Sequence, residues 1–347
     1  QLPDDTKRFE SIDQEFKDLM KEQVNRPNVI EACTGSEGLL EQLCGMTTNL
    51  ELCQKSLNEY LDMKKKVFPR FYFVSNVALL DILSNGNNPP KIMPYVSDCY
   101  DALHTLEFVA STADNVYETN TMISSDGERV PFPESIGNFR IDGAVEDWLN
   151  QLTKKMKSCL AHVLDAGIET AVNWEVERPR DLWLFDYPAQ VVLTATQNTW
   201  TEEAEKALEE YECGQDDAVR TYLELCNKRL HDLIKLVQGD LKKPNRTKII
   251  SLITMDVHSR DVVDKLVKEK TEGPTKFLWQ QQLRYYWEPA QKAVNIRICD
   301  FNTLYSYEYI GNCGRLVITP LTDRCYITLT TALRLMLCGA PAGPAGT

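Results

Sequence analysis

Residues 219–237 read VRTYLELCNKRLHDLIKLV, and this stretch has the clearest periodicity in the chain. Its apolar side chains recur at steps of three and four residues, which places them on one face of an α-helix. Gly239, and Pro244 beyond it, mark the end of that helix. Because a single apolar face needs a partner to cover it, the stretch predicts a protein built from packed helices. The face consists of Val219, Tyr222, Leu223, Cys226, Leu230, Leu233 and Val237.

The same spacing predicts further helices toward the N-terminus. Residues 50–61 form an apolar stripe that ends near Phe68-Pro69, since proline disfavours helix in the residue before it. Ser75-Asn76 predicts an N-cap for a helix over residues 77–83. The run NGNNPP at residues 85–90 ends that helix.

Two longer helical regions follow. Residues 143–167 predict one helix with an apolar side that includes Trp148 and Leu152. Residues 249–270 predict a pair of helices interrupted near His258-Ser259. We interpret all these apolar faces as core packing, since none has the pattern of a cofactor site.

A smaller part of the chain predicts β-structure. The turn sequence SSDG at residues 124–127 separates two β-prone runs, residues 120–123 and 129–132, and predicts a small hairpin. Ile296 and Ile298 alternate with polar residues, as in a strand. From Tyr305 onward we expect a loop, then a strand, then a helix. That last helix would have Thr322 or Asp323 as its N-cap and would stop at Gly339.

The composition narrows the classes of function. The chain has 347 residues, 11 cysteines and a formal net charge of −13, which argues against nucleic acid as a partner. It has no apolar run of the roughly 18–20 residues that a membrane span needs. The cysteines are scattered without a C-x-x-C pair, so we expect buried free thiols in a reducing compartment and no zinc site. The first residue is Gln1, and we expect the chain to be a segment of a longer protein.

One motif carries chemistry. The chain ends Gly343-Pro344-Ala345-Gly346-Thr347, which matches the first five residues of the P-loop pattern G-x-x-x-x-G-K-[ST]. In such a loop, backbone N–H groups surround the phosphates of a nucleotide, and the glycines let the backbone come close. The lysine and the Mg²⁺-binding hydroxyl residue of the pattern are not among these five. The motif alone also fits a flexible Gly/Pro/Ala tail.

Several segments together resemble the dynein heavy-chain family. Residues 53–61 (CQKSLNEYL), 68–76 (FPRFYFVSN) and 79–84 (LLDILS) resemble its linker region, and residues 279–287 (WQQQLRYYW) resemble the linker's last segment. Residues 307–311 (YEYIG) and 315–324 (RLVITPLTDR) resemble the start of the first AAA+ module. Residues 339–347 then look like the P-loop of that module, cut short. The segment around residues 75–87 is more similar to axonemal than to cytoplasmic members, and the outer arm is a candidate within that type.

The resemblance implies a mainly α fold: an elongated helical-bundle linker with a small hairpin, followed by the truncated start of an α/β AAA+ P-loop module. It implies linker at residues 1–306 and the first AAA+ module from residue 307 to residue 347. The parent protein would be a minus-end-directed microtubule motor of cilia and flagella, using ATP with Mg²⁺. Its partners would be its own AAA+ ring, the microtubule through an absent stalk, intermediate and light chains, and other heavy chains.

The resemblance also implies roles for particular residues. Gly343 to Thr347 would contact the phosphates, and Leu316, Val317, Pro320 and Leu321 would line the adenine pocket. It implies no catalytic residue and no metal ligand in this chain, which we do not expect to be active alone. Trp279, Tyr285, Tyr286 and Trp287 would form a packed hinge between linker and ring. From its residues alone, we interpret the acidic run from Glu202 to Glu212 as an exposed helix face.

Three alternatives remain open from the sequence. Within the family, a cytoplasmic or intraflagellar-transport heavy chain is the alternative to an axonemal one. Outside it, the chain could be a structural helical scaffold whose Gly-rich end has no nucleotide function. A third alternative is a separate P-loop enzyme with a helical regulatory domain. The residues that follow Thr347 in the parent protein would distinguish these possibilities.

Overall fold

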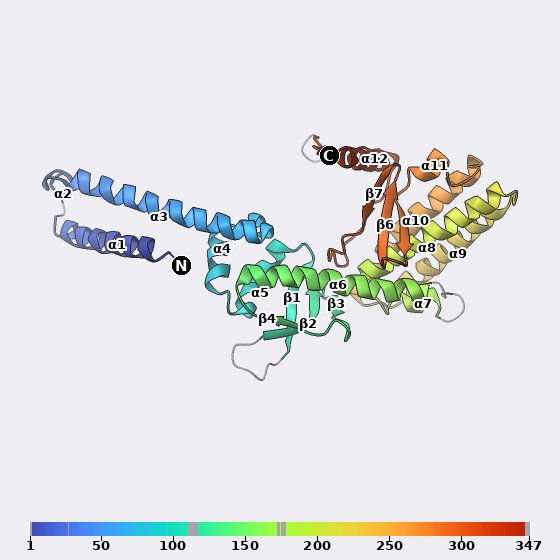
Figure 1. Cartoon of the computed structure of the whole chain (residues 1–347), viewed down its shortest axis with the longest axis horizontal. Coiled ribbons are helices and arrows are strands. Elements are labelled where there is room, and N and C mark those ends of the chain that lie inside the picture. Colours follow the sequence, from blue (N-terminus) through green and yellow to red (C-terminus); the bar gives the residue numbers. More distant parts are fainter. Residues whose placement is uncertain (1, 27, 110–116, 172–173, 175–177, 344–347) are drawn as a thin grey trace. The chain divides into compact units, whose positions relative to one another are not determined.

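The computed structural model describes residues 2–26, 28–109, 117–171, 174 and 178–343 (Figure 1). The chain divides into two compact units. Unit 1 comprises Gln1–Gly86 with Ala144–Leu149, and unit 2 comprises Asn87–Gly143 with Asn150–Thr347. The predicted mainly helical fold is confirmed.

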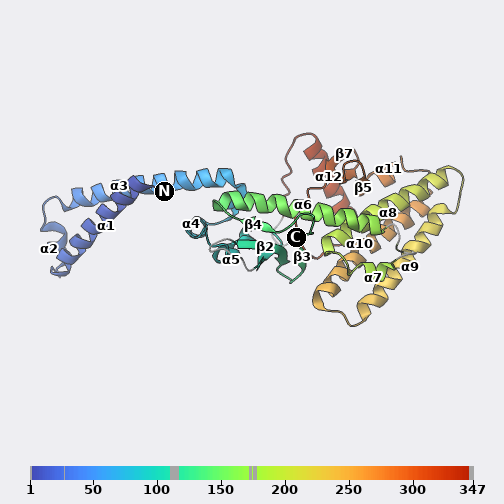
Figure 2. The same cartoon turned by 60° about the horizontal axis from the view of Figure 1, so that its bottom comes forward.

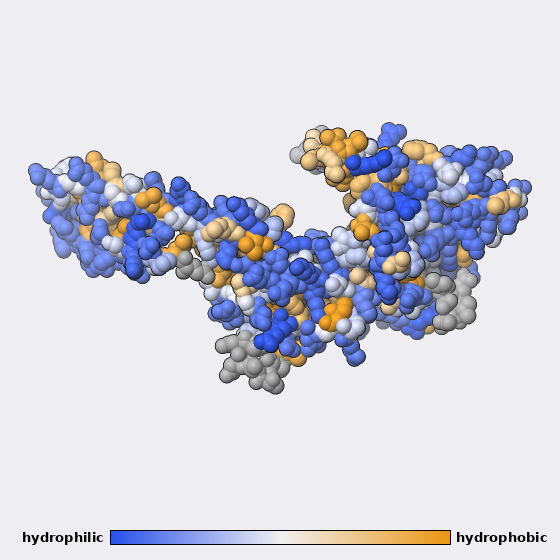
Figure 3. Space-filling view, viewed as in Figure 1, coloured by the Kyte–Doolittle hydropathy of each residue, from blue (hydrophilic) through white to orange (hydrophobic). Residues whose placement is uncertain are grey.

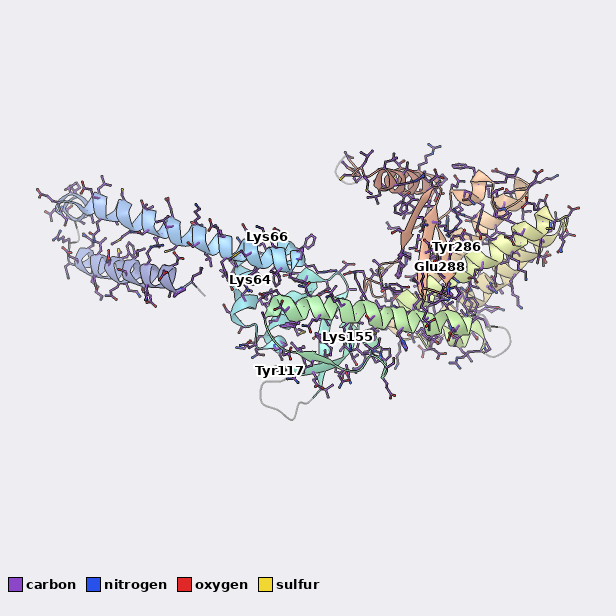
Figure 4. The ribbon with its side chains drawn as sticks, in the orientation of Figure 1. Lys64, Lys66, Tyr117, Lys155, Tyr286 and Glu288 are labelled. Carbon is purple, nitrogen blue, oxygen red and sulfur yellow. The ribbon has the colours of Figure 1, made fainter. Side chains whose placement is uncertain are left out.

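Unit 1 is helical. Its elements are α1 (Pro3–Val24), α2 (Val29–Thr34), α3 (Leu39–Val67), the short 3-10 helix η1 (Pro69–Phe73) and α4 (Asn76–Ser84). The predicted end of α3 before Phe68-Pro69 is confirmed, and so is the cap of α4, where the Ser75 hydroxyl accepts from the Ala78 N–H at 3.2 Å. Lys64 in the last turn of α3 pairs with Glu146 (Figure 4). The core of the unit includes Leu61, Phe68, Phe71, Leu79 and Ile82.

Unit 2 begins with a helix and an antiparallel sheet of four strands. These are α5 (Pro89–Cys99), β1 (Leu103–Val109), β2 (Tyr117–Ser124), β3 (Arg129–Pro131) and β4 (Phe139–Ile141). β2 pairs with β1 along one edge and with β3 and β4 along the other. The predicted hairpin is confirmed, with Met122 opposite Val130. β1 and β4 enlarge it into a sheet.

A long helix, α6 (Val145–Ala171), follows the sheet, and its residues from Asn150 onward belong to unit 2. Several contacts tie this part of α6 to the first half of the unit. The Thr153 hydroxyl lies 2.8 Å from the Tyr100 hydroxyl, and the Cys159 thiol donates to the Pro131 carbonyl at 3.7 Å. Lys155 on the same helix bonds the Ile136 carbonyl (Figure 4).

The main helical layer of unit 2 consists of α7 (Arg180–Trp183), α8 (Ala189–Glu212), α9 (Ala218–Gln238) and α10 (Lys243–Lys268). α8, α9 and α10 lie side by side in both views (Figures 1 and 2). The predicted helix over residues 219–237 is confirmed as α9, and its face packs against Val262 and Val263 of α10. The predicted break near His258-Ser259 is wrong, because α10 is continuous. Neither Gly nor Pro interrupts residues 245–268, and side chains are buried on both sides of the predicted break, Leu252 before it and Val263 after it.

The last part of unit 2 combines a second sheet with two helices. α11 (Phe277–Gln280) leads into the antiparallel strands β5 (Arg284–Glu288), β6 (Ala293–Ile298) and β7 (Phe301–Leu304), and α12 (Pro320–Arg334) follows. The strand predicted at Ile296 and Ile298 is confirmed as β6. The strand expected between Tyr305 and α12 is absent: residues 305–319, all of them described, form no strand.

The cysteines correct one expectation. All 11 lie within the described residues and none forms a disulfide, but Cys33, Cys44, Cys213, Cys313, Cys325 and Cys338 are exposed, not buried. Burial raises the pKa of the Cys159 and Cys226 thiols to about 12. Among the described residues, no cluster of His, Cys, Asp or Glu could hold a metal ion. No described helix combines the length and the apolar character needed to cross a membrane.

Candidate functional site

The predicted phosphate loop falls at the limit of the described chain. Gly343 is exposed and lies in neither a helix nor a strand. Pro344, Ala345, Gly346 and Thr347 lie outside the described residues. Their role therefore stays a prediction that depends on the sequence motif.

The four predicted adenine-pocket residues lie on two adjoining pieces of chain. Leu316 and Val317 belong to the irregular stretch before α12, and Pro320 and Leu321 form the first turn of α12. All four are exposed, with 82% exposure for Leu316, 73% for Val317 and 71% for Leu321. Side chains this open are not enclosed by other described residues, and their role in adenine binding stays a prediction.

The start of α12 corrects the predicted cap. Thr319 is the N-cap, and it forms a capping box with Thr322, whose hydroxyl accepts in turn from the Thr319 N–H at 3.3 Å. Two donors at the helix N-terminus are thereby satisfied reciprocally. Asp323 lies in the first turn, where a negative charge favours the helix. α12 ends at Arg334, before the predicted Gly339, and a Cβ on Gly339 would overlap the Leu329 side chain.

The aromatic cluster after α10 is packed as expected. The fully buried Trp279 lies with its ring centroid 5.1 Å from that of Trp200 on α8. Its indole N–H donates to Glu205 at 2.9 Å, and the Tyr286 hydroxyl donates to the same carboxylate oxygen at 2.5 Å (Figure 4). Burial is the main cause that raises the pKa of Tyr285 to about 12. The proposed role of this cluster as a hinge stays a prediction.

The acidic stretch on α8 is only partly the exposed face that we predicted. Glu205 is engaged as described, and Glu203 forms an ion pair with Arg229 of α9. Glu202 and Glu209 are exposed. Sequence alone could not separate these roles, because Glu203 and Glu205 find their partners on α9, α11 and β5.

The structure also shows residues that sequence reasoning missed. Gln190 on α8 and Glu128 in the turn between β2 and β3 both contact the segment Tyr305–Cys313, which leads toward α12. A single Gln in a helix and a single Glu in a turn belong to no motif. No sequence signal could have identified them.

Two family models match separate parts of the chain. The family model described as "Dynein heavy chain, N-terminal region 2" matches residues 1–167. The model described as "Hydrolytic ATP binding site of dynein motor region" matches residues 305–347. The class of protein is therefore one in which a helical part precedes the start of an ATP-binding region.

Individual relatives match from end to end. Dynein axonemal heavy chain 17 of Homo sapiens is 46% identical over 100% of this chain, which covers 8% of that relative. The ciliary dynein beta chain of Tripneustes gratilla is 44% identical, again over 100% of this chain and 8% of the relative. The flagellar outer arm dynein beta chain of Chlamydomonas reinhardtii is 43% identical over 100% of this chain and 7% of the relative. The chain belongs to the dynein heavy-chain family.

Proposed function

We propose that this chain is part of an ATP-driven motor that moves toward the minus ends of microtubules. Residues 1–306 would form the C-terminal portion of its linker, and residues 307–347 would begin its first AAA+ module. The observation that carries the proposal is similarity over the whole chain, at 41–46% identity, to axonemal dynein heavy chains. The ATP-site match at residues 305–347 supports the position of the nucleotide region.

Within this proposal, two groups of residues contact the nucleotide. Gly343 to Thr347 would hold the phosphates through backbone N–H groups. Leu316, Val317, Pro320 and Leu321 would cover the adenine, and their exposed apolar side chains suit its flat face. Mg²⁺ would neutralise phosphate charge, held by the hydroxyl residue that completes the pattern. Residues 1–347 contain neither that residue nor the P-loop lysine, so we do not expect them to hydrolyse ATP alone.

The helical part would act as a lever. Nucleotide at the first module would change how the ring closes, and the linker would swing across the ring in the power stroke. Only contacts that differ between the two positions can shift such an equilibrium. The shared core of α8, α9 and α10 supports this role, because a lever needs stiffness.

The setting follows from the relatives. Axonemal, ciliary and flagellar names favour a motor of the axoneme, assembled in the cytoplasm, over a cytoplasmic or intraflagellar-transport heavy chain. The outer-arm relative makes the outer arm the more specific proposal. The partners would be the chain's own AAA+ ring, the microtubule, intermediate and light chains, and other heavy chains.

The test uses the heavy chain that contains this segment, with Gly346→Val in the proposed loop. A side chain there would displace the phosphates, and a misplacement of about 1 Å can cost ~100-fold in rate. We expect loss of microtubule-stimulated ATP turnover and of ATP-driven microtubule gliding. Cys338→Ser, at an exposed position nearby, should retain both activities. Normal gliding by Gly346→Val would favour the structural scaffold instead.

A further inference from the structure

The segment Tyr305–Cys313 has neither helix nor strand, yet a buried amide holds it along its length. Gln190, in the first turn of α8, is only 2% exposed. Its Nε2 donates to the Tyr305 hydroxyl at 2.7 Å and to the Glu308 carbonyl at 2.6 Å. Its Oε1 accepts from the Ile310 N–H at 3.0 Å. Both amide hydrogens and the amide oxygen are used, so the contacts define one orientation of the side chain.

The carboxylate of Glu128 also fixes the same segment. One oxygen of Glu128 accepts from the Ala189 N–H at 2.7 Å, and the other accepts from the Tyr309 hydroxyl at 3.0 Å. Pro188, the N-cap of α8, provides no side-chain bond, so Glu128 satisfies a free donor at the positive end of that helix. Tyr309 is 1% exposed. One carboxylate therefore connects the β2–β3 turn, the start of α8 and the segment.

The far end of the segment is fixed against α10. Asn312 donates through its Nδ2 to the Pro244 carbonyl at 2.8 Å, and the Ser251 hydroxyl donates to the Cys313 carbonyl at 3.2 Å. At the near end, the Tyr305 N–H donates to the Val294 carbonyl of β6 at 2.9 Å. From Cys313 to Val317 the residues are exposed. The hydrogen bonds that fix the segment therefore end at Cys313, just before the predicted adenine-binding residues.

We propose that Gln190 and Glu128 form a clamp, defined as these two side chains with their bonds to Tyr305, Glu308, Tyr309 and Ile310, that transmits force between the helical part and the ATP-binding region. The proposal rests on the motor function proposed above. Glu128 lies in the part matched to the dynein N-terminal region, and Tyr309 lies in the part matched to the ATP site. Without the clamp, a segment lacking regular structure would absorb a displacement by bending. Both side chains are positioning residues, since neither would touch the nucleotide.

The main experiment compares Gln190→Ala with Gln197→Ala in the intact heavy chain. Gln197 lies seven residues later on α8, and its amide donates at 3.2 Å to Leu283, outside the segment. The readout is the distance moved per ATP, obtained from gliding velocity and ATP turnover in one preparation. We expect Gln190→Ala to reduce it at least about twofold, the lower end of what losing a coupling contact costs. Gln197→Ala should leave it unchanged. A loss of folded protein alone lowers the measured turnover and does not shorten the step of the remaining motors.

A second pair of variants removes single hydroxyl groups, so that misfolding does not decide the result. Tyr309→Phe removes only the hydroxyl that reaches Glu128, and Tyr222→Phe removes a buried hydroxyl that bonds the Trp200 carbonyl, away from the segment. We expect Tyr309→Phe to reduce the distance per ATP less than Gln190→Ala does, and Tyr222→Phe to leave it unchanged. If both clamp variants retain the normal distance per ATP, the clamp proposal is wrong.

Hydrogen exchange of the 347-residue chain separates this proposal from the motor function. Loss of a buried hydrogen bond should speed exchange in peptides covering residues 303–314 by about tenfold in Gln190→Ala and not in Gln197→Ala. Unchanged exchange would mean that Gln190 does not hold the segment, whatever the motor does. A wild-type heavy chain that neither hydrolyses ATP nor moves microtubules would overturn the proposed motor function. It would also overturn force transmission, even if hydrogen exchange showed that Gln190 fixes the segment.

Discussion

At the scale of single residues, the clamped segment has an unusual backbone. Tyr307 has φ 54° and Gly311 has φ 56°, both in the left-handed region that L side chains rarely adopt. The Tyr307 hydroxyl accepts from the Val294 N–H at 3.2 Å, a contact that helps hold its conformation. Gly311 has a second constraint, because a Cβ there would lie 3.0 Å from the Cβ of Ala102 and 3.6 Å from that of Ser124. Turn geometry and close packing both select glycine.

Gly311→Ala tests this double constraint. The left-handed conformation costs roughly 1–2 kcal/mol for a residue with a Cβ, and overpacking adds typically ~1–3 kcal/mol. The control is Gly137→Ala, at φ 70° with nothing within 4 Å of the added Cβ. Urea denaturation should show a larger loss in the free energy of unfolding for Gly311→Ala than for Gly137→Ala. Equal losses would mean that Ala102 moves aside without cost.

At the scale of elements, Glu205 on α8 joins that helix to α11 and β5. Its carboxylate accepts from the Trp279 indole and the Tyr286 hydroxyl, and it lies 3.7 Å from the guanidinium of Arg284. The Arg284 side chain is 4% exposed, so its charge depends on nearby acceptors. A single acidic residue thereby fixes the second sheet of unit 2 against the helical layer.

Glu205→Ala should therefore be strongly destabilising. It leaves the buried indole N–H of Trp279 without its acceptor and removes the negative charge beside the Arg284 guanidinium, whose remaining partners, the Tyr286 hydroxyl and the Gln280 carbonyl, are neutral. Breaking a buried ion pair costs about 3–5 kcal/mol. Glu209→Ala, at an exposed position on the same helix, should change the free energy of unfolding by no more than about 0.5 kcal/mol. Guanidinium denaturation of both variants measures the difference. Similar stabilities would show that water replaces the carboxylate.

Helices and turns could be predicted where the signal is local. The three-and-four spacing identified α9, Ser75 identified the start of α4, and SSDG identified the β2–β3 turn. β1 and β4 were missed because their pairing with β2 depends on the tertiary fold. The break near His258 was wrong because two polar residues inside a helix are tolerated when their neighbours pack. Gln190 and Glu128 could not be found, since their roles exist only after distant segments meet.

At the scale of the whole molecule, one group of exposed apolar side chains lies on α12 and the residues after it. Leu321, Leu333, Leu335 and Met336 are all more than half exposed, and Met336 reaches 93%. Figure 3 shows apolar side chains gathered over this helix. Contiguous apolar surface of this kind is uncommon on a monomer in water and promotes association.

We expect the 347-residue chain to self-associate through this surface. Replacing Leu333 and Met336 by lysine should shift the chain toward monomer, because charges in a contact surface oppose its burial. Val24→Lys, at an apolar position on α1 with 78% exposure, should leave association through α12 unchanged. Light scattering coupled to size-exclusion chromatography over a range of concentrations measures both. Association that survives the α12 variant would have to involve another surface.

The bonds made by Gln190 also determine where the polypeptide can change in length. Three partners spread over Tyr305–Ile310 must meet one side chain, so an extra or missing residue between them would leave the amide with the wrong atoms. Residues 314–317 are exposed, and no buried side chain fixes their spacing in the way that Gln190 fixes residues 305–310. The fold of the 347-residue chain should therefore tolerate an inserted residue at Gly314 or Arg315, before the predicted adenine-binding residues, and should not tolerate one between Tyr305 and Ile310. This boundary gives a practical guide for attaching a small fluorophore next to the clamp without changing its hydrogen bonds.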